Sequence, residues 1–360
     1  MKILDRYLIK QFIQIFLFGL LAFTLLFVVI DMMENLDDFI DQEVNIRIVV
    51  HYYFVFIPEI IRLMMPVAVL LSSLFTIGRL STQNELAAIK ASGVSIYRLM
   101  IPFLGVALVI SIFSVYFGGF VAPQANKQKV QFEKIYMKKG VVHGEGNVSF
   151  QDTKTRIVTM LYFNNFKREG VRISIQEFNP NNITDLIVRY DSQLIRYDSL
   201  TGNWFLIDGV KRTFNGDKET AEFFEKDTLT NLKFKPDDVI KKQAKLEELT
   251  LTELQDFADD QLKSGNDPTR VYIEYHSRFA FAFASLVVVL FGMPISANKR
   301  KGGMAVQVGK NLAITFIYLG FMKISQAFGK NGILDPLLTA WFANIIFLIS
   351  AIIGIIRMQK

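Results

Sequence analysis

Two carboxylates stand out in this sequence because their spacing gives each of them a possible role. Glu59 and Arg62 lie three residues apart within a long apolar stretch, so on a helix they share one face. Ionisable side chains at membrane depth often belong to a functional site. The alternative is an ion pair near the outer membrane interface that orients the helix, with bends at Pro58 and Pro66, and we favour this alternative.

The second carboxylate, Glu85, belongs to the most distinctive short motif, residues 81–93. Thr82 and Glu85 have the spacing of a capping box, the following residues are good helix formers, and Gly93 stands where a helix-ending glycine belongs. The motif predicts a short helix between two apolar stretches. Such a helix could dock on a partner protein or pack on its own bundle, and the residues alone leave both alternatives open.

No pattern in the sequence indicates an active site. Gly309, Lys310 and Asn311 resemble the end of a nucleotide-binding Walker A loop, but Met304 replaces its first glycine and no Ser or Thr follows the lysine. The three histidines are far apart, and the chain has no cysteine, so neither a catalytic triad nor a metal site is indicated. We therefore expect no catalytic residues, no metal ligands and no cofactor in this chain.

Six long apolar stretches position these motifs, three near each end of the chain. They cover residues 12–30, 49–78, 99–121, 279–295, 312–324 and 337–356. A helix needs roughly 20 apolar residues to cross a bilayer. Only the fourth and fifth stretches look short, and flanking residues such as Tyr272, Tyr275 and Val306 would extend them. The sequence predicts six membrane spans in a 3+3 arrangement.

The charges of the short loops predict the orientation of these spans. Lys and Arg gather before the first stretch, in the second and fourth loops, and after the sixth stretch, whereas the first and fifth loops are poor in them. Cytoplasmic loops carry the excess of Lys and Arg. Both termini are therefore expected inside and the large insertion outside. Because this bias explains the net charge of +6, that charge does not indicate nucleic acid.

The insertion, residues 124–270, is polar and strand-like, and it separates the membrane segments 1–123 and 271–360. Strands are predicted at residues 156–163, 171–178, 186–190, 193–197, 204–207 and 222–224. Short strands with turn signals between them favour an antiparallel sandwich or a jelly roll. Residues 249–263 predict a helix with a capping box at Thr250 and Glu253.

Several motifs distributed over the chain support a more specific identification. They are LDRY at 4–7, IPE at 57–59, ELAAIKASG at 85–93, VAPQ at 121–124, GNWFL at 202–206, YHSR at 275–278 and GILDP at 332–336, followed by Trp341. Together with the 3+3 layout, the pattern resembles the LptF/LptG permeases, the membrane subunits of the lipopolysaccharide-export ABC transporter. The residues after Val121 and at 202–206 look closer to LptG than to LptF.

This resemblance implies six inner-membrane helices, cytoplasmic termini and a periplasmic β-jelly roll. It also implies four partners: a second LptF/LptG-type permease, an LptB-like ATPase dimer that binds ATP and magnesium, an LptC-like protein, and lipopolysaccharide itself. The residues implied to couple to the ATPase are Glu85, Leu86, Ala88, Ile89 and Gly93. The residues proposed to line the lipid cavity are Phe23, Phe27, Phe316 and Phe321.

One departure from the family concerns the lipid phosphates. The outer end of the first span is acidic, where relatives often carry basic residues; these acidic residues are Asp31, Glu34, Asp37 and Asp38. We expect Lys127, Lys129 and Lys134 to meet the phosphates instead. Bridging divalent cations, or a lipid with fewer phosphates, are the alternatives.

Two other functions are kept open. A lipoprotein-releasing ABC permease resembles this chain but has four spans, with the large domain after the first. A membrane-anchored periplasmic scaffold or enzyme would need neither the short helix at 81–93 nor an ATPase.

Overall fold

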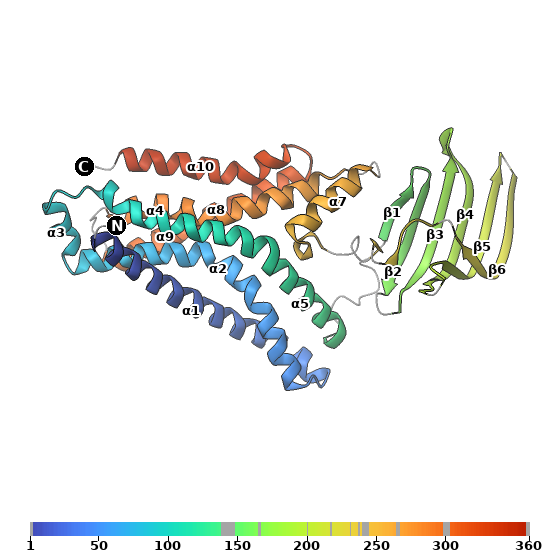
Figure 1. The fold of residues 1–360 in the computed structure, drawn as a ribbon, viewed down its shortest axis with the longest axis horizontal. Coiled ribbons are helices and arrows are strands. Elements are labelled where there is room, and N and C mark those ends of the chain that lie inside the picture. The colour runs from blue at the N-terminus through green and yellow to red at the C-terminus, as the bar shows by residue number, and fades with distance from the viewer. Residues whose placement is uncertain are drawn as a thin grey trace. The chain divides into compact units, whose positions relative to one another are not determined.

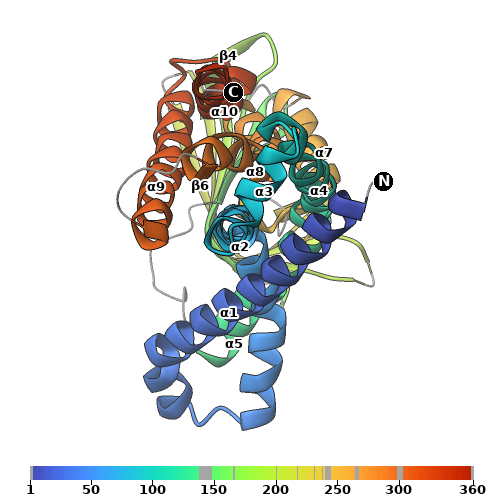
Figure 2. The same ribbon diagram turned by 90° about the vertical axis from the view of Figure 1, so that its left-hand side faces the viewer.

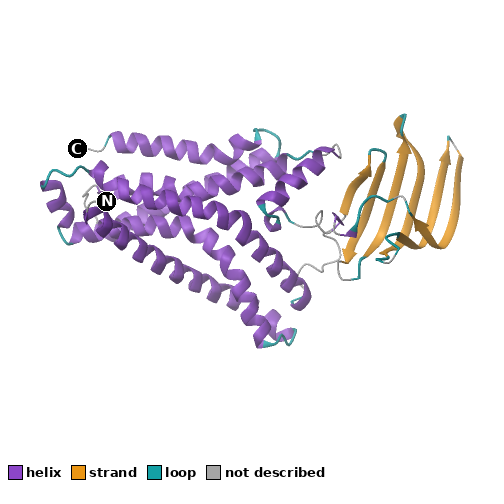
Figure 3. Cartoon of the chain, in the orientation of Figure 1, coloured by secondary structure: helices purple, strands orange, loops and turns teal. Residues whose placement is uncertain are grey.

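The computed structural model describes residues 3–137, 148–164, 167–199, 201–216, 218–230, 232–236, 238–239, 245–263, 267–297 and 303–357. The chain divides into a helical unit, residues 1–138, 246–258 and 267–360, and a β unit, residues 139–245 and 259–266. Figure 3 shows the helices and the strands separately coloured. Residues 124–136, which the sequence assigns to the insertion, belong to the helical unit.

The helical unit contains the long helices predicted from the apolar stretches (Figure 1). Its elements are α1 (Ile3–Asp41), α2 (Ile46–Thr82), α3 (Glu85–Ala91), α4 (Ile96–Tyr116), the π-helical turn η1 (Phe117–Val121), α5 (Ala122–Tyr136), the 3-10 turn η2 (Leu246–Glu248), α7 (Leu251–Lys263, which continues into the β unit), α8 (Thr269–Ala297), α9 (Gly303–Lys330) and α10 (Pro336–Ile356). Six segments of the described chain are long and apolar enough to cross a membrane: α1, α2, α4 with its continuation into α5, α8, α9 and α10. The 3+3 arrangement of candidate spans is therefore confirmed.

Polar side chains fix where several helices begin. The side chain of Asn45 accepts a hydrogen bond from the amide of Arg47 at the start of α2. Asp335 caps α10, whose first residue is a proline, and proline suits this position because its missing N–H is not needed there. The capping box predicted for α7 is also present, since Thr250 N donates to Glu253 Oε2 over 2.8 Å and Glu253 N donates to Thr250 Oγ1 over 3.3 Å.

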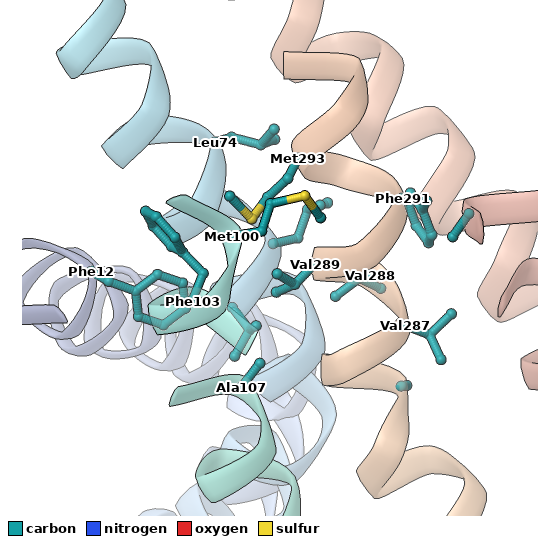
Figure 4. Close-up of a cluster of buried hydrophobic side chains, with 14 of the residues drawn as sticks. Phe12, Leu74, Met100, Phe103, Ala107, Val287, Val288, Val289, Phe291 and Met293 are labelled. Carbon is teal, nitrogen blue, oxygen red and sulfur yellow. The ribbon is translucent and has the colours of Figure 1, made fainter. Parts of the chain in front are cut away.

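One hydrophobic core joins α1, α2, α4, α8, α9 and α10. Figure 4 shows part of it, where Phe12 of α1 lies against Phe103 of α4 and Met100 lies beside Met293 of α8. The rings of Phe12 and Phe103 meet edge to face with centroids 5.6 Å apart. Between membrane helices, close packing and hydrogen bonds rather than removal from water stabilise association.

A buried asparagine fastens the last three helices to one another. Asn344 of α10 donates from Nδ2 to the carbonyl of Ala280 in α8 over 2.8 Å. Its Oδ1 accepts a hydrogen bond from the hydroxyl of Tyr318 in α9. Both partners are buried, so this side chain satisfies polar groups that would be costly to leave unpaired in an apolar environment.

The β unit contains one antiparallel sheet in which the strands follow one another in sequence, β1 to β6. The strands are β1 (Val148–Thr153), β2 (Arg156–Asn164), β3 (Glu169–Asn179), β4 (Asn182–Tyr197), β5 (Trp204–Asn215) and β6 (Lys218–Leu229). An inserted antiparallel β domain is therefore confirmed. Among the described residues, a return segment (232–236 and 238–239) packs on the inward face of this sheet, the face that carries its buried apolar side chains.

Contacts with β1 and β5 hold the return segment on the sheet. The indole Nε1 of Trp204 in β5 donates to the carbonyl of Phe234 over 3.0 Å. Asp152 of β1 accepts from the amides of Lys233 and Phe234 through Oδ1. The ring of Phe234 also meets the ring of Phe150 edge to face at 4.9 Å. The segment after β6 thus crosses the inward face back to β1.

A crease crosses the sheet at Arg172, Gln193 and Asp208, which lie between paired neighbours on β3, β4 and β5. On either side of the crease, the buried residues are three positions apart instead of two, as with Gly170 and Ile173 in β3 and with Ser192 and Ile195 in β4. Arg172 and Asp208 have φ values of 49° and 52°, a conformation that is strained for residues other than glycine. Each of these three strands thus contains one extra residue at the crease, and the strands pair in the same register on both sides of it.

The crease explains where the strand predictions fail. Residues 186–190 and 193–197 were predicted as two strands, but they belong to the single strand β4. Prediction of β5 stopped at residue 207, just before the crease, whereas the strand continues to Asn215. Strand β1 was not predicted. The change from a spacing of two to a spacing of three interrupts the alternation that indicates a strand.

A substitution at Gly209, next to the crease, tests this packing. A Cβ at this position would lie 2.6 Å from the carbonyl oxygen of Asp191 and 2.5 Å from Cζ of Phe224. We expect Gly209→Ala to destabilise the β unit by about 1–3 kcal/mol, because a backbone atom cannot move aside easily. Asp208→Gly, which relieves the positive φ, should have no effect or the opposite one. Hydrogen exchange of the β4–β6 amides measures both, and equal protection in the two variants would contradict the expectation.

Candidate functional site

The short helix α3 lies at the end of the helical unit where both termini are found (Figure 1). It follows α2 directly and precedes α4, so it connects two candidate membrane spans. The predicted helix between two apolar stretches is therefore present. The basic residues of the fourth loop, 299–301, fall outside the described residues.

Only the C-terminal end of α3 agrees with the prediction from the sequence. Gly93 has a φ of +84° just after the helix, as expected for a helix-ending glycine. The capping box at Thr82 is wrong, because the Thr82 hydroxyl donates to the carbonyl of Gly78 in the last turn of α2 over 2.9 Å. The residue before α3 is Asn84, with a φ of 57° and no side-chain capping bond. Because α2 extends to Thr82, this residue ends α2 and does not cap α3.

Helix α3 combines a buried anchor with an exposed surface. Leu86 is buried in the core of the helical unit, together with residues of α1, α2 and α4. Ile89 is partly buried against the same core, whereas Ala88 and Gly93 are exposed and Glu85 is half-buried. The helix therefore packs on its own bundle through one side and leaves the other side open, so docking on a partner stays a prediction.

A residue far away in the sequence contacts Glu85. The hydroxyl of Tyr7 in α1 donates to Oε2 of Glu85 over 3.1 Å. Two residues earlier, Asp5 forms an ion pair of 2.8 Å with Arg98 at the start of α4. No role was predicted for Asp5 or Tyr7, although both lie in the LDRY motif, which was the available signal.

The proposed cavity residues differ in their exposure. Phe27 of α1 and Phe316 of α9 are exposed, with 37% and 66% of their surface accessible. Phe23 is half-buried. Phe321 is packed against the core, with its ring stacked on Phe342 of α10 at 5.9 Å. Phe27 and Phe316 are thus free to contact lipid or a partner chain, whereas Phe321 mainly packs α9 against α10.

The helices that carry these phenylalanines both pack against α2. Figure 2, which looks along the bundle, shows α2 between α9 and the first half of α1. Only 11% of the membrane segment of α1 is buried, compared with 67% for α8. The middle of α1 therefore presents a long apolar surface outside the bundle.

The lysines proposed for lipid phosphates lie on α5, and one of them, Lys129, is close to an acidic group. Lys129 Nζ is 3.4 Å from Oε1 of Glu133 and 4.1 Å from the ring centroid of Phe56. Its charge is therefore already balanced within the unit, which lowers its value as a phosphate ligand. Lys127 is half-buried. The side chain of Lys134 lies outside the described residues.

Glu59 and Arg62 form the ion pair that their spacing predicts, with Arg62 Nε 2.9 Å from Glu59 Oε2. The Arg62 side chain lies beside Gly118 of η1, where a Cβ would be 3.3 Å from Arg62 Cδ. Its guanidinium carbon is 5.7 Å from the ring centroid of Phe281 in α8. The pair thus joins α2, η1 and α8, which supports the structural alternative.

A buried arginine in α8, Arg278, holds the chain that returns from the β unit. Arg278 of α8 donates to the carbonyls of Leu246 and Leu249 and lies 3.5 Å from Glu274. The side chain of Leu251 fits against Gly119 of η1, where a Cβ would lie only 2.4 Å from Leu251 Cδ1. These contacts fix the part of the chain that returns from the β unit.

Comparison with known proteins agrees with this architecture. The family model described as "Lipopolysaccharide export system permease LptF/LptG" matches residues 6–357. The chain belongs to the LptF/LptG permease family. LptF of Escherichia coli K12 and LptF of Shigella flexneri are each 22% identical over 371 residues, covering 98% of this chain and 94% of the relative.

The match also bears on the alternatives. These relatives carry the name LptF, so they give no support to a closer likeness to LptG. Six candidate spans instead of four, together with the LptF/LptG match, decide against a lipoprotein-releasing permease. As a member of this family, the chain is a permease component of a lipopolysaccharide export system.

Proposed function

We propose that this chain is the permease subunit of an ATP-driven ABC transporter that extracts lipopolysaccharide from the inner membrane and passes it to a periplasmic bridge. The observation that carries the proposal is the full-length LptF/LptG match on a chain whose two sets of three candidate spans are joined by an inserted β domain. ATP and magnesium would be bound by the partner ATPase and not by this chain.

Energy would enter through α3. Its buried Leu86 anchors it to the bundle, while Ala88 is exposed and the carboxylate of Glu85 is half-buried. A helix held in this way can transmit force without unpacking. We infer that its open side occupies a groove of an LptB-like ATPase dimer, with Glu85 as the charged contact.

The acyl chains would bind between α1, α9 and a second LptF/LptG-type permease. Phe27 and Phe316 are exposed on these helices, and the membrane segment of α1 is mostly unburied. Burial of acyl chains contributes about 0.8 kcal/mol per CH₂, so apolar surface would supply most of the affinity for a lipid with several chains. Release then requires closure of the cavity.

The loop charges, together with the common position of α3 and both termini, support the proposed orientation. In this arrangement α3 and the termini are cytoplasmic, the β domain is periplasmic, and the lipid would pass to an LptC-like protein. For the lipid phosphates, Lys127 is a better candidate than Lys129, which is paired with Glu133. Cations of the partner permease or a bridging divalent cation would supplement it.

Affinity purification of the tagged chain from membranes in mild detergent tests this proposal. Mass spectrometry should find an ATPase, a second permease of the same family and bound lipopolysaccharide. A periplasmic scaffold or enzyme would purify without an ATPase. Recovery of the intact chain with no ATPase, under conditions that preserve a known ABC complex, would contradict the proposed function.

A further inference from the structure

Tyr7 connects the first membrane helix to the coupling helix. Its hydroxyl donates to Oε2 of Glu85 over 3.1 Å, although 78 positions separate the two residues in sequence. Tyr7 is 41% exposed, so this hydrogen bond lies at the surface of the helical unit and not in its core. A carboxylate can accept several hydrogen bonds, and Tyr7 engages one oxygen while Oε1 can accept another donor.

The first turns of α1 are attached both to α3 and to the start of α4. Asp5 is bonded to Arg98 at the start of α4 over 2.8 Å, and Tyr7 is bonded to Glu85 at the start of α3. Leu8 and Phe12, on the following turn, are fully buried in the core. Together these contacts join the beginnings of α1, α3 and α4 into one assembly.

The rest of α1 is packed much less closely. Only 11% of its membrane segment is buried, and large side chains such as Phe18, Leu21 and Leu25 are exposed. A helix that is firmly attached at one end and loosely packed along its middle can tilt when its attached end moves. The attached end of α1 is hydrogen-bonded to Glu85, the residue of α3 that we expect the ATPase to bind.

We propose that Tyr7 is a positioning residue that orients the Glu85 carboxylate for the ATPase and passes movement of α3 to the first span. This inference rests on the proposed function of α3. Tyr7 restricts Glu85 before binding, so less conformational freedom is lost when the ATPase docks. The same hydrogen bond makes α1, with its lipid-facing surface, respond to displacement of α3.

Tyr7→Phe tests the inference because it removes one oxygen atom and retains the ring. We expect the ATPase to bind about three- to tenfold more weakly, the usual effect of losing one ordinary hydrogen bond, because this bond is exposed to solvent. Lipid release per ATP hydrolysed should also fall at saturating ATPase, which a merely stabilising contact would not affect. In a Glu85→Ala background, Tyr7→Phe should cause no further loss, because its partner is already absent.

Tyr97→Phe is a matched control. Tyr97 lies at the same end of the helical unit, is 37% exposed, and donates to the carbonyl of Ile355 over 3.1 Å. This variant should bind the ATPase normally, and all variants should unfold at similar temperatures. If Glu85→Ala weakens binding but Tyr7→Phe behaves like Tyr97→Phe, only the role of Tyr7 is overturned. If Glu85→Ala binds normally, the docking role of α3 fails with it.

Discussion

Glu85→Arg is expected to abolish binding of the ATPase and export of lipid while the permease remains folded and inserted. Glu85 is half-buried on the open side of α3, where we expect a cationic partner. Removing one member of a buried, hydrogen-bonded charge pair at an interface costs about 2–5 kcal/mol, or roughly 30- to 5,000-fold in affinity. Arginine also cannot accept the hydrogen bond from Tyr7, so the positioning contact is lost as well.

Lys90→Glu provides the control for this prediction. Lys90 is exposed in the last turn of the same helix, so the variant also reverses one charge on α3 and opposes the helix dipole to a similar extent. Pull-down of the ATPase and lipid release from membranes should be lost in Glu85→Arg and largely retained in Lys90→Glu. Equal losses would indicate that the charge of the helix matters but the site does not. Normal export by Glu85→Arg would disprove the coupling role.

The membrane part of this fold was predictable because a single physical requirement determines it. Backbone groups in lipid must be satisfied within the segment, so each apolar stretch is read as a helix, and loop charge alone suggests the orientation. The fourth and fifth apolar stretches, which look short in the sequence, belong to the longer helices α8 (Thr269–Ala297) and α9 (Gly303–Lys330), because polar residues continue each helix beyond its apolar part.

The β unit was less predictable because the alternation of buried and exposed residues shifts by one position within its strands. At Gln193 the inward residues are three positions apart, and this change appears in the sequence as the end of a strand. Arg172 and Asp208 adopt positive φ values at the same crease. Residues of this kind are not expected there from propensity, so no local rule could have predicted a strand that continues through them.

Helix α3 illustrates the same limit at the level of side chains. Gly93 was found because helix ends leave a local pattern, whereas the capping box with Thr82 that drew attention to Glu85 is absent. The hydrogen bond from Tyr7 to Glu85 spans 78 positions and leaves none. Lys129 was proposed as a phosphate ligand from its charge and position, but its pairing with Glu133 and its contact with Phe56 became visible only in the structure.

Arg278 is the residue on which attachment of the returning chain depends most. Its side chain is only 4% exposed beside Glu274, and it donates to the carbonyls of Leu246 and Leu249. An arginine can make these contacts together because its donors form a rigid planar fork. Since the first and larger segment of the β unit ends at residue 245, residues 246–249 are the first part of the chain to rejoin the helices.

Arg278→Met should therefore release this segment and destabilise the helical unit by about 3–5 kcal/mol, because Glu274 and two carbonyls lose their partner in a buried site. Hydrogen exchange of residues 246–258 should become faster, while exchange in α10 changes little. Arg278→Lys keeps the charge but cannot reach both carbonyls at once, so an intermediate effect is expected. Arg270→Met removes an exposed arginine from the same helix and should behave like the unmodified protein. If residues 246–258 exchange at the same rate in Arg278→Met and Arg270→Met, the returning chain is held by the packing of Leu251 against Gly119 instead of by Arg278.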